Sequence, residues 1–240
     1  MSSSIPGHAV PAPGSAPRSS PVARISRGAL TANARAAWER GIRSFDPSVL
    51  EADAWGHGDS LVREVLEAQR FVAAETPVVT AAHGPAIGRP PTMLTPSTLL
   101  GLPGAGPSAT PAMRLTGTVL SVKDLCVGEG VSYGYAYRAA ADTRIALVTG
   151  GYAQGIVRGL GGAVDVALEG RRHPIVGRVA MDVCVVEVSD AAVRRGDEVL
   201  FLGDPAHGEP SLESWVRTTG LSEGELVTMV GLRAIREEAA

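Results

Sequence analysis

The sequence predicts an α+β fold, in which a short α/β segment precedes a larger β-rich domain. Helix and strand patterns alternate through residues 23–74, whereas short strands separated by glycine turns follow one another from residue 113. A stretch rich in proline and glycine, 75–112, lies between them and is predicted to be a linker. The 240 residues are 45% hydrophobic, which is enough to bury a sizeable core.

Residues 1–22 are rich in Ser, Pro, Ala and Gly and contain no continuous apolar stretch. We therefore predict a disordered tail there and not a signal peptide. The helical spacing of Leu30, Ala34, Ala37 and Trp38 then predicts a helix that ends near Gly41.

Residues 48–52 are predicted to form a short buried strand. Asp59 is the predicted N-cap of a second helix, which carries apolar residues as far as Ala68. Residues 71–73 are predicted to form a second strand. This strand–helix–strand order implies a parallel pair.

In the linker, residues 78–80 and 99–100 are the two candidate strands. Beyond it, the predicted strands of the β-rich domain, 113–240, are 114–122, 145–148, 164–168, 175–177, 183–188 and 198–202. Two helices, at 212–218 and 223–236, are predicted to end the chain.

Composition excludes several functional classes. The net charge is −3, the pI is about 6.0 and no basic tract is present, so nucleic acid is not expected as a partner. No stretch is long and apolar enough to predict a membrane span. The cysteines, Cys126 and Cys184, lack metal-ligand spacing, so we expect no metal site and two free buried thiols in a reduced, cytoplasmic protein.

The β-rich domain carries four motifs in a fixed order. Residues 128–137 read GEGVSYGYAY, 151–155 GYAQG, 174–182 PIVGRVAMD and 196–199 GDEV. Their order and spacing resemble the C-terminal domain of the alanine racemase family, although any single motif would be a weak signal. The resemblance implies pyridoxal-phosphate-dependent interconversion of L- and D-alanine.

By this resemblance, Tyr133 occupies the position of a catalytic acid/base. Tyr152 and Met181 occupy positions that line the substrate pocket and reach into the active site of the other subunit. The plain structural alternatives are a tyrosine packed in a glycine-rich turn for Tyr133 and ordinary core filling for Met181.

The segment 49–58 reads VLEADAWGHG and resembles the family segment that carries the cofactor lysine. Glu51 stands at the lysine position, and a carboxylate cannot condense with an aldehyde to give an imine. Trp55 stands where the family has a tyrosine that contacts the cofactor phosphate, and His57 is expected to be structural. The only lysine, Lys123, is expected to be a solvated surface residue.

A complete (β/α)₈ barrel needs about 250 residues, whereas residues 25–113 number fewer than half of that. The α/β segment at 23–74 is therefore expected to be a truncated, unclosed barrel fragment. We expect a degenerate racemase-like protein without independent activity. We expect it to bind no cofactor, and only the family resemblance points to pyridoxal phosphate. Three alternatives stay open: a component that contributes Tyr133 in trans to a full-length alanine racemase subunit, a non-enzymatic interaction module, and a non-functional remnant of a deleted gene. The expected partner is a second copy of the chain or a full-length alanine racemase.

Overall fold

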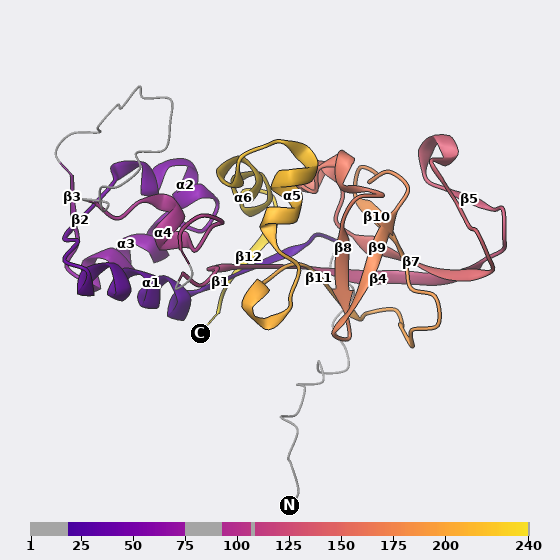
Figure 1. Cartoon of the computed structure of the whole chain (residues 1–240), viewed down its shortest axis with the longest axis horizontal. Helices are drawn as coiled ribbons and strands as arrows, with labels where there is room; N and C mark the ends of the chain where they lie inside the picture. Colours follow the sequence, from indigo (N-terminus) through magenta and orange to yellow (C-terminus); the bar gives the residue numbers. More distant parts are fainter. Residues whose placement is uncertain (1–18, 75–92, 107–108, 240) are drawn as a thin grey trace, which may run out of the picture.

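The computed structural model describes residues 19–74, 93–106 and 109–239. Figure 1 shows a group of helices with a small sheet at one end of the long axis and a large sheet at the other. The helices α5 (Leu212–Thr219) and α6 (Glu223–Gly231) lie between the two groups. This arrangement confirms the predicted α+β fold.

The chain enters through β1 (Val22–Ser26), a strand that the sequence patterns did not predict. The helix α1 (Arg27–Glu39) follows and confirms the first predicted helix. Ser26 caps α1, because its hydroxyl oxygen accepts the backbone N–H of Ala29 at 3.0 Å.

The prediction of a strand at 48–52 is wrong. Pro47–Leu50 form the 3₁₀ turn η1, and Glu51–Trp55 form the short helical segment α2. Asp46 starts η1 by accepting the N–H of Ser48 at 2.9 Å, and Pro47 at its first position favours a turn over a strand. The first strand is instead β2 (Ser44–Phe45).

A parallel pair forms as predicted, but with a different first strand, since β2 and not residues 48–52 pairs in parallel with β3 (Val72–Ala73). The connecting helix α3 (Asp59–Ala68) is also confirmed, although its N-cap is Gly58 and Asp59 is the first helical residue. Within the described residues, Leu94 extends this small sheet by a parallel bridge to Phe45.

The candidate strand at 78–80 lies outside the described residues. The candidate strand at 99–100 is wrong, because these residues end the helix α4 (Pro96–Leu100). Thr95 caps α4 by accepting the N–H of Thr98 at 3.3 Å, and Gly101 ends it at a φ of 67°.

All six predicted strands of the C-terminal region are confirmed. They are β4 (Met113–Leu125), β7 (Thr143–Thr149), β8 (Asp165–Leu168), β9 (Arg171–Val176), β10 (Val183–Glu187) and β11 (Glu198–Leu202). Their order is β11-β8-β9-β10-β7-β4, and β11 also pairs with β4, so the six strands close into a barrel. A separate hairpin joins β5 (Gly130–Val131) to β6 (Tyr137–Arg138).

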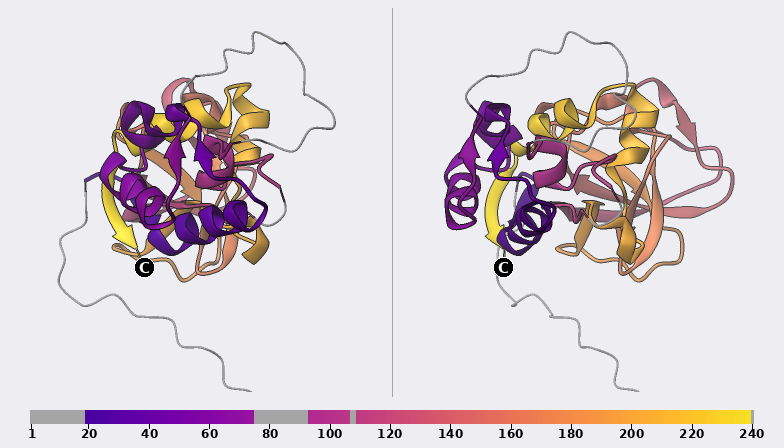
Figure 2. Two further views of the ribbon diagram at one scale, coloured as in Figure 1. Left: turned by 90° about the vertical axis from the view of Figure 1, so that its left-hand side faces the viewer. Right: turned by 60° about the vertical axis from the view of Figure 1, so that its left-hand side comes forward.

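The last predicted helix is only partly correct. It ends at Gly231, and the chain then forms the strand β12 (Ile235–Ala239), which pairs in parallel with β1. β1 in turn pairs antiparallel with β4, so both terminal strands extend the barrel sheet. In both views of Figure 2, β12 lies against the N-terminal helices.

The largest hydrophobic core is continuous across the predicted domain boundaries. It contains Leu30 and Leu66 of the N-terminal helices together with Leu115 and Phe201 of the barrel and Trp215 of α5. Cys184 is buried as expected, but Cys126 is exposed, because it lies in the turn between β4 and β5.

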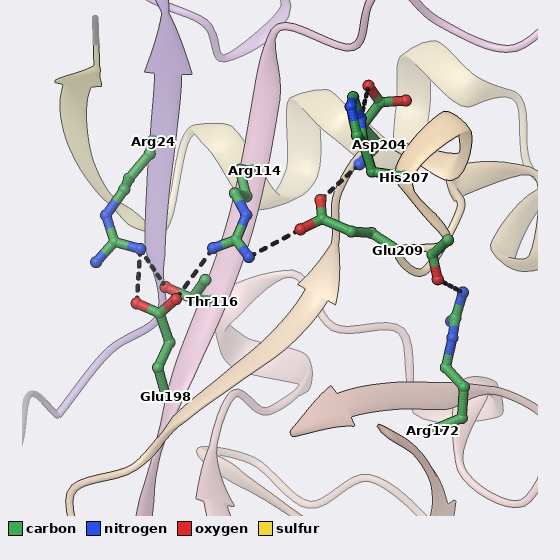
Figure 3. A network of polar contacts seen from close by, with 9 residues as sticks. Arg24, Arg114, Thr116, Arg172, Glu198, Asp204, His207 and Glu209 are labelled. Atoms are coloured by element: carbon green, nitrogen blue, oxygen red, sulfur yellow. Dashed lines mark hydrogen bonds and ion pairs between the residues drawn. The ribbon is translucent and has the colours of Figure 1, made fainter. Parts of the chain in front are cut away.

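A polar network ties β1 to the barrel wall (Figure 3). Glu198 of β11 accepts from Arg24 of β1 at 2.6 Å and from Arg114 of β4 at 3.0 Å, and Arg114 also pairs with Glu209 at 3.0 Å. These side chains are partly exposed, so each pair contributes about 1 kcal/mol or less. Their role is to fix the relative orientation of three strands.

Candidate active site

Two of the predicted site residues lie on neighbouring loops of the barrel. Tyr152 opens the 3₁₀ turn η3 (Tyr152–Gln154), and its N–H donates to the carbonyl oxygen of Ala180 at 2.9 Å. The N–H of Ala153 donates to the carbonyl oxygen of Met181 at 3.0 Å. Gly151 permits this contact, since a Cβ at that position would lie 2.0 Å from the Met181 carbonyl oxygen.

The turn that carries Tyr133 is joined to the same loop. Tyr133 opens the 3₁₀ turn η2 (Tyr133–Tyr135), although its side chain lies outside the described part of the structure. The Ser132 hydroxyl donates to the Arg178 carbonyl at 2.7 Å and accepts the Arg178 N–H at 2.9 Å. Residues 177–182 therefore connect the backbone positions of Tyr133, Tyr152 and Met181.

Met181 and Tyr152 face solvent. Their exposed fractions are 55% and 40%, so neither side chain fills the core of this chain. The Arg158 guanidinium lies 5.8 Å from the centre of the Tyr152 ring. Beside them, an open hollow of about 480 Å³ is lined mainly by apolar side chains, including Tyr135, Leu147 and Val185.

The segment that carries Glu51 has an unusual backbone. Four consecutive residues after it, Ala52 to Trp55, have φ between 48° and 57°. A left-handed turn of this kind costs roughly 1–2 kcal/mol for each non-glycine residue, so the surrounding structure must hold it. The Arg236 guanidinium does so by pairing with Asp53 at 2.6 Å. Glu51 itself is exposed at the start of the turn.

Trp55 is tied into the fold by both ends of its side chain. The indole N–H donates to the Ser48 carbonyl oxygen at 2.9 Å. The six-membered ring packs so closely on Gly224 of α6 that a Cβ there would lie 2.3 Å from it. The hydrogen-bonding group of Trp55 is therefore already used within the chain.

His57 is buried beside this turn. Its Nδ1 lies 3.0 Å from the Trp55 carbonyl oxygen and 3.2 Å from that of Ala54, whereas its Nε2 has no partner among the described residues. Burial, with a smaller contribution from the Arg236 charge, lowers the pKa of His57 to about 4. The imidazole is therefore neutral near pH 7, as a structural role requires.

We expect this burial to make the protein sensitive to acid. The unfolded chain takes up the His57 proton near pH 6.5, whereas the folded chain resists it until about pH 4. The free energy of unfolding should therefore fall between these values as the pH is lowered, by on the order of 3 kcal/mol. Urea unfolding at pH 7.0, 5.5 and 4.5 measures the loss. His57→Asn keeps a hydrogen-bond donor near the position of Nδ1 but cannot titrate. If the free energy of unfolding of this variant falls with pH as steeply as that of the unchanged protein, the assignment to His57 is wrong.

The two groups of predicted site residues are not brought together within one chain. α6 separates them, since its Gly224 contacts Trp55 and its Met229 and Val230 backbone contacts Gly155 at the end of η3. In Figure 1, α2 and the turn after β5 lie at opposite ends of the molecule. Lys123 is exposed on β4, where it pairs in register with Ile145 of β7.

Comparison with known proteins identifies the barrel region. The family described as "Alanine racemase, C-terminal domain" matches residues 112–238. The chain belongs to the alanine racemase family. This match covers all four motifs that the sequence analysis singled out.

The curated relatives are alanine racemases of greater length. The alanine racemase of Mycobacterium leprae is 42% identical over 128 residues, which are 52% of this chain and 33% of the relative. That of Thermobifida fusca is 38% identical over 130 residues, which are 54% of this chain and 35% of the relative. The matches thus span about a third of the length of these curated relatives.

Solved alanine racemases share the architecture. The structure from E.faecalis is 31% identical with a TM-score of 0.56 and covers 61% of this chain and 41% of that one. The Streptomyces coelicolor A3(2) structure aligns over 92% of this chain and 98% of that one with a TM-score of 0.77. At 20% identity, the second likeness concerns the fold alone.

Sequence reasoning missed the residues that join the racemase-family loops. Ser132 and Arg178 are both inside quoted motifs, but nothing in a motif indicates that one side chain bonds the backbone of the other. Among the described residues, no group of three or more His, Cys, Asp or Glu side chains could hold a metal ion. None of the helices there is long and apolar enough to cross a membrane.

Proposed function

We propose that this alanine racemase family member does not catalyse pyridoxal-phosphate-dependent racemisation by itself. The observation that carries the proposal is Glu51, which occupies the position where the resemblance places the cofactor lysine. A carboxylate has no amine to form an imine. The exposed position of Glu51 at the start of the left-handed turn supports the proposal, because no described lysine lies nearby to replace it.

The residues present do not fit pyridoxal phosphate. Lys123 is the only lysine of the chain, and it lies on the barrel strand β4, away from α2. Trp55, at the position of a phosphate-contacting tyrosine, already donates its N–H to Ser48. We therefore assign no step of a reaction to the cofactor in this chain.

Incubation with pyridoxal phosphate followed by borohydride reduction tests this proposal. We expect intact-mass and peptide spectra to show no stoichiometric pyridoxyl adduct at a single site. Trace labelling of Lys123 should rise linearly with reagent concentration, as expected for an exposed amine, and it should disappear in the Lys123→Arg variant. A saturable adduct in one-to-one ratio would overturn the proposal.

A second function is favoured by the exposed loops of the barrel. The resemblance implies that Tyr133, Tyr152 and Met181 act in the active site of another subunit, and the exposure of Tyr152 and Met181 supports such a use in this chain. In that case the chain would be a component that supplies Tyr133 in trans to a full-length alanine racemase. A non-enzymatic interaction module would use the same surface. Homo-oligomerisation and a cytoplasmic location belong to the proposal as well.

Binding to a full-length racemase and the D-alanine formation of the mixture together separate these possibilities. A component should change the D-alanine formation of a full-length subunit whose own tyrosine at the position of Tyr133 has been replaced by Phe. A module should bind without restoring activity, and Tyr133→Phe in this chain is the matched control.

A further inference from the structure

Three exposed side chains and a hollow form one apolar face of the barrel. Tyr135 is 65% exposed, and Tyr152 and Met181 also face solvent. The hollow of about 480 Å³ includes Tyr135 and Ala180 in its lining, and the Ala180 carbonyl oxygen accepts the backbone N–H of Tyr152 at 2.9 Å. We call Tyr135, Tyr152, Met181 and this hollow the loop face. Exposed apolar surface of this kind marks a place where another segment or protein binds.

The chain that precedes the described residues joins the fold beside the loop face. The side-chain amide nitrogen of Gln154 donates to the Ser19 carbonyl oxygen at 3.2 Å. The amide oxygen of the same side chain accepts the N–H of Gly151, which directly precedes Tyr152, at 3.0 Å. Residues 1–18 can span about 60 Å when extended, so their length does not limit contact with the face.

The composition of residues 1–18 suits an apolar surface that carries aromatic rings. Its four prolines are Pro6, Pro11, Pro13 and Pro17. Proline-rich segments bind grooves lined by aromatic side chains, and they lose little conformational entropy in doing so. Tyr135 and Tyr152 supply such rings on the loop face. Residues 1–18 contain no Asp or Glu that could pair with the nearby Arg158 and Arg178, so the contact would be apolar.

We propose that residues 1–18 bind across the loop face of their own chain and cover it. The proposal goes beyond the proposed function, because it concerns access to Tyr152 and Met181 and requires nothing of Glu51. Any partner that uses these loops has to displace the segment, so the segment regulates binding there. A tethered segment has an effective concentration on the order of millimolar, so a modest intrinsic affinity is enough to keep the face covered.

Oxidation of Met181 by hydrogen peroxide measures whether the face is covered. The segment variant Pro6→Ser/Pro11→Ser/Pro13→Ser/Pro17→Ser keeps the full chain and changes none of the described residues. We expect Met181 of the unchanged chain to form the sulfoxide at least about threefold more slowly than Met181 of the segment variant, because the bound segment excludes the reagent. Met93, which is half-buried before α4, should oxidise equally in both chains. Peptide mass spectra give both rates, and their ratio should not depend on protein concentration.

A labelled peptide of residues 2–18 tests the contact in trans by fluorescence anisotropy. It should bind the segment variant, and it should bind the unchanged chain at least about tenfold more weakly, because the chain's own segment competes. Adding Tyr152→Ser/Met181→Ser to the segment variant should abolish binding. Adding Val72→Ser/Leu232→Ser, which changes two exposed apolar residues outside the loop face, is the matched control and should leave binding unchanged. Raising the salt concentration should change the affinity by less than about twofold, since an apolar contact is not screened.

Several results would overturn the proposal. These are equal oxidation of Met181 in the two chains, a peptide that does not bind the segment variant, and peptide binding that is indifferent to Tyr152 and Met181. Protection that grows with protein concentration would mean that another copy covers the face, and strong weakening by salt would mean a charged contact. Either would also overturn the proposal. The borohydride experiment does not involve residues 1–18, so a failure of the proposed function can be told apart from a failure of this contact.

Discussion

Gly151→Ala is expected to destabilise the protein by about 3 kcal/mol, near the upper end of the effects of overpacking. The added Cβ would lie 2.0 Å from the Met181 carbonyl oxygen and 2.3 Å from the Asp182 nitrogen. Both are backbone atoms, and the same carbonyl accepts the N–H of Ala153. The clash therefore cannot be relieved by rotating a side chain. It must separate the loops that carry Tyr152 and Met181.

Urea unfolding of this variant measures the loss directly. Gly159→Ala is the matched control, because Gly159 lies in the nearby turn η4 (Arg158–Leu160), where no heavy atom lies within 4 Å of the position that the added methyl group would take. The control should change the free energy of unfolding by no more than about 0.5 kcal/mol. Equal stability of the two variants would mean that the loops at 151 and 181 do not approach each other as closely as described.

Glu51→Lys is expected to leave alanine racemisation undetectable. Enzymes accelerate reactions by at least about 10⁶-fold, and the amine is only one contributor to that factor. The indole N–H of Trp55 is already used in a hydrogen bond to Ser48, and the turn that carries Tyr133 lies at the opposite end of the molecule from α2 (Figure 1). An amine at position 51 should therefore react with pyridoxal phosphate as an exposed amine does, without racemising alanine.

A coupled assay for D-alanine, run over days at high protein concentration, checks this expectation. Glu51→Gln removes the charge without supplying an amine and serves as the baseline. Sustained D-alanine formation by Glu51→Lys above this baseline would show that two copies of the chain assemble most of a working site. It would also show that the Glu51→Lys variant is a catalytically active member of the racemase family.

Local sequence patterns were sufficient to predict the strands of the barrel. The strands β4, β7, β8, β9, β10 and β11 were predicted from alternating apolar residues and glycine turns, because their side chains alternate between core and solvent. The loops of the candidate site were predicted as motifs, since their residues resemble those of the alanine racemase family in order and spacing. The sequence analysis therefore named Tyr152 and Met181 individually, but it did not predict that their loops are neighbours.

Contacts between distant segments decided the rest. β1 and β12 are more than 200 residues apart in the chain and became strands by pairing with each other and with β4. Residues 48–52 were predicted to form a strand, yet residues 52–55 form a left-handed turn, which Arg236 and α6 hold in place. The sequence by itself determined the family and the barrel strands, and it led to the prediction that Glu51 stands at the position of the cofactor lysine, since each depends on residue type and local spacing. Only the tertiary structure decided that Glu51 and the turn of Tyr133 face solvent at opposite ends, because their separation depends on how α6 packs between α2 and η3.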